Sequence, residues 1–455
     1  MKLKLYTLAL LLSTLLVQSC NTTKSEVKDT NIENQPFENI PSPEDVVLYQ
    51  VNIRTFSESG DFKGVIARLD SIKSIGANVI YLMPIYPIGK EKSVNSPYCI
   101  QDYLSVNPEF GSLKDLQRLV QKAHNLDMAV ILDWVANHTA YDHVWIKNKD
   151  WYQQDSTGSI ISPPGTGWND VAQLNFDNED MTNEMVKSMK YWVKTANIDG
   201  FRCDYSDGPP YKFWSRAIDS LRNTTGHELI MLSEGRRNNH FTAGFDYNFG
   251  FDFFENLRKI FNEERSAVSI DSFNIANYNG ANEHQRMVRY TSNHDINGSE
   301  GTPLELFGGV EGSLSAFIIT TYMKSVPMIY SGQEVGTPYR LTFPFTEKDI
   351  DWSINKDITE KYKQIISVYN QENSIRRGKL TPFSNDEVVA FSKEFENEQV
   401  IVFCNVRSEN VKIEIPETLN SSDFKNVFTN KPFILNNTLE LGPYEYLVIK
   451  EIKSI

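Results

Sequence analysis

Four short polar segments, each at the end of an apolar run, constrain this chain more than any other feature. The apolar runs cover residues 128–132, 197–201, 228–232 and 287–291, and the polar segments read DWVANH (133–138), GFRCD (200–204), LSE (232–234) and NHD (293–295). Short apolar runs separated by helical patterns are typical of parallel strands covered on both faces. In a barrel of such strands, reactive side chains gather at the carboxyl ends. The sequence therefore predicts that these segments meet in one site.

The chain is long enough for such a barrel and one further small domain. A (β/α)8 barrel takes about 250 residues before insertions, and the chain has 455 residues. Apolar runs predict the first two strands at residues 46–51 and 78–82 and the eighth at 326–330, with an amphipathic helix at 63–75. We therefore expect an α/β fold in which residues 45–378 form a (β/α)8 TIM barrel.

Two stretches depart from this alternation of strands and helices. Residues 138–175 lose the helical period and are rich in Trp, Gly, Pro and Asp, and a loop of that length predicts a functional insertion. From residue 379 onward, alternating strand-like runs separated by turns predict an all-β sandwich domain over residues 379–455. Stabilisation of the barrel is the simpler interpretation of this domain, and a separate ligand-binding role is the alternative.

The first 44 residues carry an export pattern. Two lysines precede an apolar stretch at residues 5–17, which is short for a membrane span and predicts a signal peptide over residues 1–20. Cys20 follows a small residue and resembles the cysteine that bacteria lipidate, so we expect lipidation there. An ordinary cleaved signal is the alternative. Residues 21–44 are polar and end in a proline-containing stretch, which predicts a tether without a core of its own.

Composition narrows the possible partners and the covalent chemistry. The net charge is −14 and 12% of the residues are aromatic, and the sequence has no basic stripe that could neutralise phosphates. We therefore expect no nucleic-acid partner, whereas a neutral ring-shaped ligand is compatible with the composition. Cys99, Cys203 and Cys404 lie far apart in the chain, which predicts free, mostly buried thiols.

In order and in residue type, the four polar segments resemble the signature regions of the α-amylase superfamily, glycoside hydrolase family 13. The resemblance covers roughly residues 47–375, with further similar pieces at MPIYP (83–87), QLN (173–175) and GQEVG (332–336). A lone NHD arises by chance in many chains, but four segments in this order at strand ends do not. The resemblance implies a glycosidase barrel in which the insertion is a short domain B.

Two carboxylates at the ends of neighbouring strands suit cleavage of a glycosidic bond with retention. That reaction needs carboxyl groups about 5–5.5 Å apart, and neighbouring strands lie about 4.8 Å apart. Asp204 and Glu234 end the fourth and fifth predicted strands. Arg202 shares a strand face with Asp204 and is expected to keep it ionised, and the apolar run before Glu234 is expected to desolvate that acid. The resemblance implies that Asp204 is the nucleophile and Glu234 the acid/base.

The resemblance also implies the residues around this catalytic pair. Asp295 would be the third catalytic carboxylate, holding sugar hydroxyls more tightly as the ring gains positive charge. The implied substrate-binding residues are Tyr98, Asp133, His138, Arg202 and His294. Tyr98 would stack on a sugar, and Asp133 would orient the site. Zinc is not expected, because no paired-cysteine or His-x-x-x-His spacing accompanies the histidines.

Several aromatic residues stay open in their interpretation. The tryptophans of the inserted loop, Trp145, Trp151 and Trp168, either stack on sugars or pack the loop, and Phe343 and Phe345 are undecided in the same way. His143 is expected to be an ordinary surface or loop residue.

The chain also departs from the family pattern. Many α-amylases have Lys-His where this sequence has Asp207-Gly208, which removes expected contacts on the leaving-group side. Many also hold calcium through the asparagine that corresponds to Asn137. With domain B short and Lys-His replaced, we expect no required cofactor and no calcium cage of that type. The alternative is a bound calcium ion, with Asn137 as its ligand. Ala172 and the ending Leu174-Asn175 are more similar to neopullulanase and oligo-1,6-glucosidase types, a weak indication of linkage preference.

The sequence thus predicts a retaining hydrolase of starch-derived α-glucans or malto-oligosaccharides. A transglycosylase or glucoside isomerase would use the same residues, and a non-catalytic glucan-binding protein is an alternative of another class. We expect a monomer that is exported and anchored by its lipid to the bacterial outer membrane, on either face. Linkage preference and endo or exo action do not follow from residue types.

Overall fold

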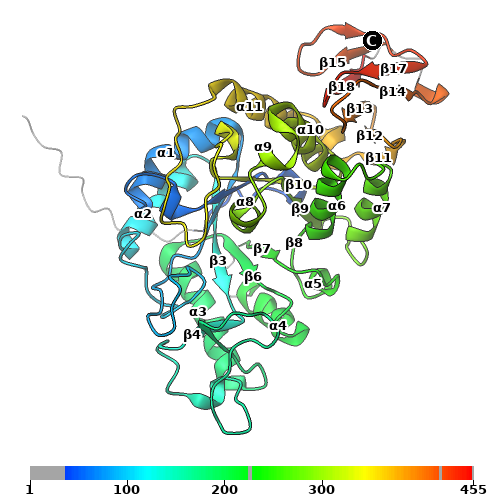
Figure 1. The fold of residues 1–455 in the computed structure, drawn as a ribbon. Coiled ribbons are helices and arrows are strands. Elements are labelled where there is room, and N and C mark those ends of the chain that lie inside the picture. Colours follow the sequence, from blue (N-terminus) through cyan, green and yellow to red (C-terminus); the bar gives the residue numbers. More distant parts are fainter. Residues whose placement is uncertain (1–35, 224–227, 420–422, 453–455) are drawn as a thin grey trace, which may run out of the picture. The chain divides into compact units, whose positions relative to one another are not determined.

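The computed structural model describes residues 36–223, 228–419 and 423–452. The predicted signal peptide (1–20), the lipidation site Cys20 and residues 21–35 of the predicted tether lie outside the described residues. Eight parallel strands close into a barrel in the order β1-β10-β9-β8-β7-β6-β3-β2, which confirms the predicted TIM barrel (Figure 1). These strands are β1 (Leu48–Val51), β2 (Val79–Leu82), β3 (Ala129–Val135), β6 (Gly200–Asp204), β7 (Ile230–Ser233), β8 (Tyr247–Phe249), β9 (Arg286–Arg289) and β10 (Val326–Tyr330).

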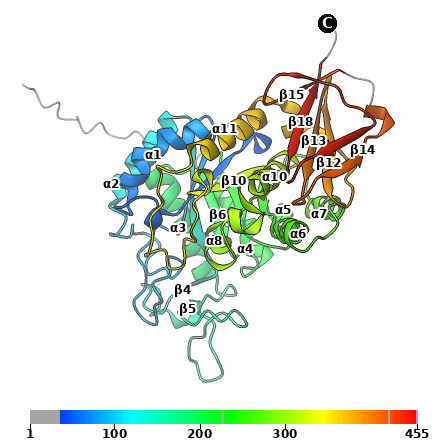
Figure 2. The same ribbon diagram turned by 45° about the horizontal axis from the view of Figure 1, so that its top comes forward.

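Helices surround the barrel (Figure 2). They are α1 (Phe62–Ile75), α2 (Leu113–Asn125), α3 (Glu179–Ala196), α4 (Tyr211–Arg222), α5 (Asn239–Thr242), α6 (Phe251–Asn262), α7 (Ser269–Asn277), α8 (His294–Ser299), α9 (Pro303–Leu306), α10 (Gly309–Tyr322), α11 (Lys356–Gln371) and α12 (Asn373–Arg377). Each barrel strand is buried along its whole length. This burial on both faces explains why the strands appear in the sequence as continuous apolar runs.

The fourth barrel strand begins three residues later than the sequence predicts. Asn197, where the prediction starts the strand, has a left-handed conformation (φ 55°) and ends α3. An asparagine in that conformation is a common helix terminus. The strand β6 therefore starts at Gly200 and ends at Asp204, so that this carboxylate occupies the last strand position.

The inserted loop packs around its own aromatic residues. It contains the antiparallel pair β4 (His138–Ala140) and β5 (Val171–Gln173). Trp145 is largely buried and contacts the ring of Trp151 at 5.3 Å. His143 is also buried, with its Nδ1 accepting a hydrogen bond from the Trp145 backbone. His143 does lie in the inserted loop, but the expectation that it is a surface residue is wrong, because the rings of Tyr103 and Trp145 pack against it and bury it.

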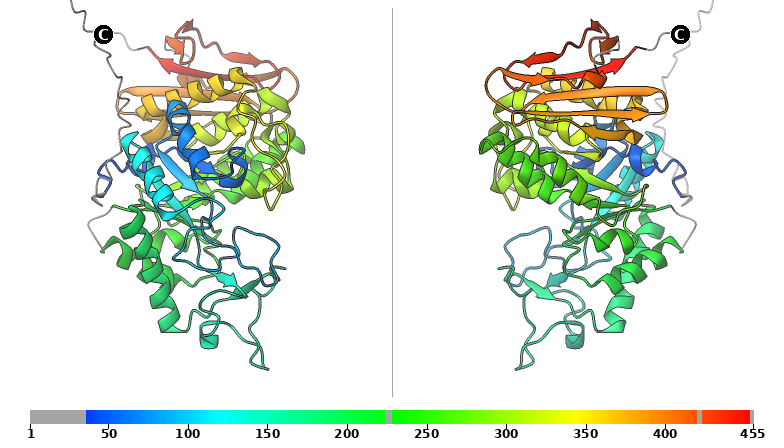
Figure 3. Two further views of the ribbon diagram at one scale, coloured as in Figure 1. Left: turned by 90° about the vertical axis from the view of Figure 1, so that its left-hand side faces the viewer. Right: turned by 90° about the vertical axis from the view of Figure 1, so that its right-hand side faces the viewer.

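The C-terminal domain is built from two antiparallel sheets. A six-stranded sheet has the order β11-β12-β13-β18-β15-β16, and a two-stranded sheet pairs β14 with β17. The strands are β11 (Lys379–Pro382), β12 (Val388–Phe395), β13 (Glu398–Asn405), β14 (Val411–Glu414), β15 (Phe424–Asn426), β16 (Pro432–Phe433), β17 (Thr438–Leu441) and β18 (Tyr446–Glu451). In Figure 3 this domain lies on the side of the barrel away from β4 and β5.

On β12 and β13, at the centre of the six-stranded sheet, residues on both faces are buried. On β12, Val389 and Phe391 belong to the apolar core of the barrel, whereas Val388 and Ala390 belong to a second core within the domain. Because side chains alternate along a strand, one sheet serves both cores. The domain is therefore attached to the barrel by a continuous apolar interface.

The described part of the predicted tether touches the barrel. The ring of Phe37 stacks on His124 at 4.4 Å, and the Asn39 side chain donates a hydrogen bond to Asp127. Among the described residues, no helix combines the length and apolar character that a membrane crossing needs. The cysteines in this part of the chain, Cys99, Cys203 and Cys404, are free and buried, as the sequence predicts.

We expect replacement of Phe391 by alanine to lower the free energy of unfolding by about 3–5 kcal/mol, the usual cost of a cavity left by a buried phenylalanine. Urea unfolding followed by fluorescence measures the change. Lys412→Ala, at an exposed position of the same domain, is the matched control and should stay within about 0.5 kcal/mol of the unmodified protein. Equal stabilities for Phe391→Ala and the control would contradict the described interface.

Candidate active site

A single buried arginine contacts three of the predicted site carboxylates. Arg202 Nη1 lies 2.6 Å from Asp133 Oδ1 and 3.0 Å from Asp204 Oδ1. Its Nη2 forms an ion pair with Glu234 Oε1. Asp133 lies on β3, Arg202 and Asp204 lie on β6, and Glu234 directly follows β7. Because β3, β6 and β7 are neighbours in the barrel, their carboxyl ends bring these groups together.

The guanidinium charge is shared among more carboxylates than it can neutralise. Burial raises the pKa of Asp204, and the neighbouring carboxylates raise it further, while Arg202 acts in the opposite direction. Burial likewise raises the pKa of Asp133. Arg202 therefore lowers the pKa of Asp204 as predicted, but burial and like charges outweigh it. Carboxyl groups packed this closely lose their protons less readily than isolated ones, and such a site is suited to acid/base chemistry.

Asp133 and Arg202 lie beneath the pocket rather than on its wall. Both side chains are fully buried, and neither lines the pocket described below. Asp133 Oδ2 accepts hydrogen bonds from the hydroxyls of Tyr81 (2.7 Å) and Tyr98 (3.0 Å). The expectation that Asp133 and Arg202 contact substrate is corrected by this placement, since their polar atoms are directed at other side chains.

His294 connects the carboxylate cluster to the first strand of the barrel. Its Nδ1 lies 2.8 Å from Gln50 Nε2, and its Nε2 lies 2.7 Å from the Tyr98 hydroxyl. Burial lowers the pKa of His294 to about 4, and Arg202 adds to this effect. If Nδ1 of the neutral His294 ring accepts a hydrogen bond from Gln50 Nε2, the ring carries its proton on Nε2. In this arrangement the ring donates to Tyr98, whose hydroxyl donates to Asp133.

The second predicted histidine lies on the pocket wall. Burial lowers the pKa of His138 to about 4, so this ring is also neutral near pH 7. The ring of Trp168 packs edge-on against His138 at 5.4 Å and against Tyr205 at 5.0 Å. Trp168 is thus a pocket residue, unlike Trp145, which packs the inserted loop.

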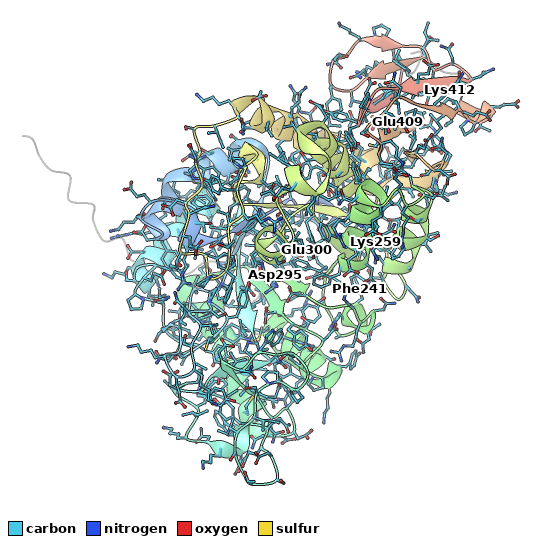
Figure 4. The ribbon with its side chains drawn as sticks, viewed as in Figure 1. Phe241, Lys259, Asp295, Glu300, Glu409 and Lys412 are labelled. Carbon is cyan, nitrogen blue, oxygen red and sulfur yellow. The ribbon has the colours of Figure 1, made fainter. Side chains whose placement is uncertain are left out.

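The third predicted carboxylate is directed toward solvent within the pocket. Asp295 is the second residue of α8 (Figure 4). Its side chain is 65% exposed. The helix start is fixed by Asn293, whose Oδ1 accepts hydrogen bonds from the backbone N–H groups of Asp295 and Ile296. This exposed carboxylate, on a helix start that is held in place, is available to bind ligand hydroxyls.

Glu234 is oriented by the backbone of the neighbouring strand end. The N–H of Tyr205 donates to Glu234 Oε2 at 2.8 Å. Tyr205 has a positive φ of 40°, a conformation that is costly for a residue with a Cβ and is typically found at functional sites. The two catalytic candidates are thus coupled through the residue that follows Asp204.

These groups face a pocket of about 1180 Å³. Ligand pockets for drug-sized molecules measure about 300–1,000 Å³, so this pocket suits a larger ligand such as an oligosaccharide. Tyr98, His138, Asp204, Glu234, His294 and Asp295 all line it. Phe343 and Phe345 also line it, Phe343 with 51% of its surface exposed and Phe345 buried against His294. The pocket therefore combines carboxylates with apolar ring faces, as sugar recognition requires.

The asparagine expected at a calcium site is engaged with other protein groups. Asn137 Nδ2 donates to Gln173 Oε1, and Gln173 Nε2 donates to Asn137 Oδ1, both at 3.2 Å. A Cβ on Gly208 would lie only 2.2 Å from Asn137 Oδ1, so the side chain fills the space beside that glycine. In the described parts of the chain, no group of three His, Cys, Asp or Glu side chains could hold a metal ion. Calcium binding at Asn137 would require this amide pair to separate.

Sequence reasoning missed three residues that organise the site. Gln50 and Tyr81 support His294 and Asp133 from the ends of β1 and β2. Both carry a polar group within an otherwise apolar strand. A polar residue in such a run can be recognised in the sequence, and it indicates a buried hydrogen bond. Asp207 lines the pocket and accepts hydrogen bonds from the loop after β7. In the sequence, Asp207 stood out only because it replaces the lysine that many α-amylases have at this position.

Family models match the first part of the barrel and most of the C-terminal domain. The family model of the α-amylase catalytic domain matches residues 24–159, and that of the maltogenic amylase C-terminal domain matches residues 379–448. α-Amylase 2 of Dictyoglomus thermophilum is 24% identical over 424 residues, covering 87% of this chain and 71% of that protein. A cyclomaltodextrinase of Thermoanaerobacter pseudethanolicus is 26% identical over 424 residues, covering 86% and 71%.

Solved structures share the fold along most of the chain. An α-amylase from Lactobacillus plantarum superimposes with a TM-score of 0.78 at 22% identity, covering 90% of this chain and 99% of that one. The maltogenic α-amylase AmyB from Thermotoga neapolitana gives a TM-score of 0.80 at 22% identity, with the same coverage. The barrel and its carboxylates are those of a glycoside hydrolase. Both family models and the curated relatives support the α-amylase superfamily, glycoside hydrolase family 13, for this chain.

The neutral state of His294 predicts a pH-dependent stability. Because its folded pKa is about 4 and an unfolded histidine has a pKa of about 6.5, the unfolded state binds the proton first on acidification. The stabilisation from the neutral ring is therefore complete above about pH 6.5 and is lost as the pH falls toward 4, by roughly 3 kcal/mol in total.

The measurement is the difference in unfolding free energy between the unmodified protein and His294→Asn at several pH values. The difference should shrink steadily between pH 6.5 and 4, because the asparagine does not titrate. In the folded protein, NMR titration should place the imidazole pKa near 4. A His294 signal that titrates near pH 6.5 in the folded state would contradict the described environment.

Proposed function

We propose that the protein hydrolyses α-glucosidic bonds of starch-derived glucans or malto-oligosaccharides by double displacement with retention. The observation that carries this proposal is the pairing of Asp204 and Glu234, at the ends of adjacent parallel strands, on the single guanidinium of Arg202. The volume of the pocket supports an oligosaccharide ligand. The names of the relatives, α-amylases and cyclomaltodextrinases, support α-glucans as the substrate class.

The reaction proceeds in two steps. In the first, Asp204 attacks the anomeric carbon and forms an ester with it, while the bond to the leaving oxygen breaks and Glu234 gives its proton to that oxygen. In the second, Glu234 takes a proton from water, and the water oxygen attacks the anomeric carbon and releases Asp204 as a carboxylate. Each step inverts the anomeric centre, so the product keeps the α-configuration.

The remaining pocket groups stabilise the sugar as its ring becomes positively charged. Asp295, exposed and oriented by the start of α8, accepts hydrogen bonds from ring hydroxyls. His138 and His294, both neutral, contact hydroxyls without adding a positive charge beside the reacting carbon. Tyr98 offers a ring face. Arg202 and Asp133 act from beneath the pocket as positioning residues.

Two alternatives remain distinguishable by experiment. A transglycosylase or isomerase would use the same covalent intermediate with a sugar as acceptor, and product analysis at high substrate concentration separates transfer from hydrolysis. A non-catalytic glucan-binding protein would bind without turnover. The complete set of carboxylates around Arg202 favours catalysis.

Incubation with maltoheptaose, pullulan and panose tests the reaction and its linkage preference. We expect NMR to detect the α-anomer first in freshly released product, because double displacement retains configuration. Chromatography of the products then identifies the cleaved linkage. Initial release of the β-anomer would refute the double displacement.

Isosteric variants separate the two catalytic roles. Glu234→Gln should lower kcat/KM on maltoheptaose by about 10²–10⁴-fold, the usual contribution of a general acid. Its activity on α-maltosyl fluoride should fall much less, because fluoride leaves with little proton assistance. Asp204→Asn should lose both activities, since both need the nucleophile. Equal losses on both substrates in Glu234→Gln would argue against its role as the acid.

We further propose that the protein is exported as a monomer and anchored to the bacterial outer membrane by a lipid on Cys20. A short apolar stretch that ends at a cysteine after a small residue supports this proposal. Mass spectrometry of the mature N-terminus should detect acyl chains on Cys20, and Cys20→Ser should move the protein from the membrane fraction to the soluble fraction. A mature chain that begins at another, unmodified residue would contradict lipidation.

A further inference from the structure

The side of the pocket that receives the leaving group is formed by the residues that follow the two catalytic strand ends. Asp207 comes three residues after Asp204, and Arg236 comes two residues after Glu234; both line the pocket. The two loops are joined, because the N–H of Ser206 donates to the backbone carbonyl of Glu234 at 2.8 Å. Given the proposed function, the departing sugar is attached through the oxygen that Glu234 protonates, so it lies against this wall.

The carboxylate of Asp207 is fixed by its neighbours on one oxygen. Its Oδ1 accepts hydrogen bonds from His240 Nε2 (2.7 Å), Arg237 Nε (3.1 Å) and the Arg237 backbone N–H (3.3 Å). A Cβ on Gly235 would lie 2.2 Å from His240 Nε2 and 2.8 Å from Asp207 Oδ1. Only glycine at this position leaves room for the arrangement, so the Glu234-Gly235 sequence is part of how Asp207 is held.

The second oxygen of Asp207 has capacity to bind a ligand. Oδ2 accepts one hydrogen bond, from the Arg236 backbone N–H at 2.8 Å, whereas a carboxylate oxygen can accept two. The side chain is 27% exposed, and the residue lines the pocket. Burial acts to raise the pKa of Asp207, but the hydrogen bonds from His240 and the Arg236 backbone outweigh it and hold the pKa at about 2. The group is therefore an oriented, ionised acceptor.

The two arginines beside Asp207 are both paired with carboxylates. The Arg236 guanidinium pairs with Asp252 through Nη1 and with Glu255 through Nη2, and it lies over the Phe251 ring at 5.1 Å. Arg237 and His240 are committed to Asp207 itself. The wall as a whole is thus negative, which favours hydroxyl donors and repels anionic groups.

We propose that Asp207 selects a neutral sugar on the leaving-group side by accepting a hydrogen bond from one of its hydroxyls through Oδ2. This inference rests on the proposed function and narrows its substrate class. It excludes leaving sugars that carry a carboxylate or phosphate at this position. In the second step of the double displacement, the acceptor enters at the position that the leaving sugar has vacated. The same wall therefore also selects any sugar that accepts the transferred glucan.

Asp207→Asn tests the role of the charge with little change in shape. A hydrogen bond to a charged group contributes about 1.5–3 kcal/mol, which corresponds to about a 10–150-fold loss. We expect a loss of this size in kcat/KM on maltoheptaose, whose leaving group is a sugar. On α-maltosyl fluoride, whose leaving group is one atom, the loss should be at least tenfold smaller.

Arg237→Gln is the matched control, because it weakens the support of Oδ1 and leaves the hydrogen bond to Oδ2 in place. If Asp207, Arg237 and His240 only hold the loops in place, each of the two variants should lose the same factor in kcat/KM on maltoheptaose and on α-maltosyl fluoride. Parallel losses in Asp207→Asn, or no loss on either substrate, would overturn the inference. Turnover of α-maltosyl fluoride by the unmodified protein tests the proposed function separately, so the two failures are distinguishable.

A second measurement needs no variant. The unmodified protein is given α-maltosyl fluoride together with glucose or glucuronate, which differ at carbon 6 by a carboxylate. Glucose should yield a transfer product, and glucuronate at the same concentration should yield at least tenfold less, because its charge faces Asp207. Equal transfer to both acceptors would overturn the inference.

Discussion

The active site depends on the position of one guanidinium at the centre of the barrel. The strand register sets Arg202 directly beside Asp133 across β3 and β6, and the two-residue period of a strand brings Asp204 onto the same face. A slip of one residue would direct Cys203 at the site and turn Arg202 and Asp204 toward the helices. The chemistry therefore rests on a backbone hydrogen-bond register that the apolar strand residues specify.

Beside this charge, neutral polar groups link the Asp133 carboxylate to the first strand. Gln50, His294, Tyr98 and Asp133 form a continuous line of contacts from the first strand to the third. A chain of this kind is oriented before any ligand arrives, and such preorganisation is worth more in a dry site than in water. The neutral state of the histidine is part of the design, because a second positive charge would compete with Arg202 for the carboxylates.

Strand-end residues could be predicted from the sequence because local rules determine them. Apolar runs locate strands to within a few residues, and side chains two residues apart on a strand share a face. These two rules were enough to predict that Arg202 and Asp204 lie side by side at a strand end. The start of β6 was missed because Asn197, which the apolar pattern places in the strand, instead caps the end of α3 in a left-handed conformation. Trp145 and Trp168 have similar loop surroundings in the sequence, yet one is buried and the other lines the pocket. Contacts between distant segments decide that difference, and single-residue patterns do not encode them.

The six-stranded sheet of the C-terminal domain supplies apolar side chains to two cores at once, with Phe391 on one face and Phe403 on the other. Cut from the barrel, this domain would present a broad apolar surface to water and associate with other chains. It is therefore not a module that could be grafted onto another enzyme or lost by recombination at a single linker. Barrel and sheet must be inherited together, and a change of volume on one side constrains the residues acceptable on the other.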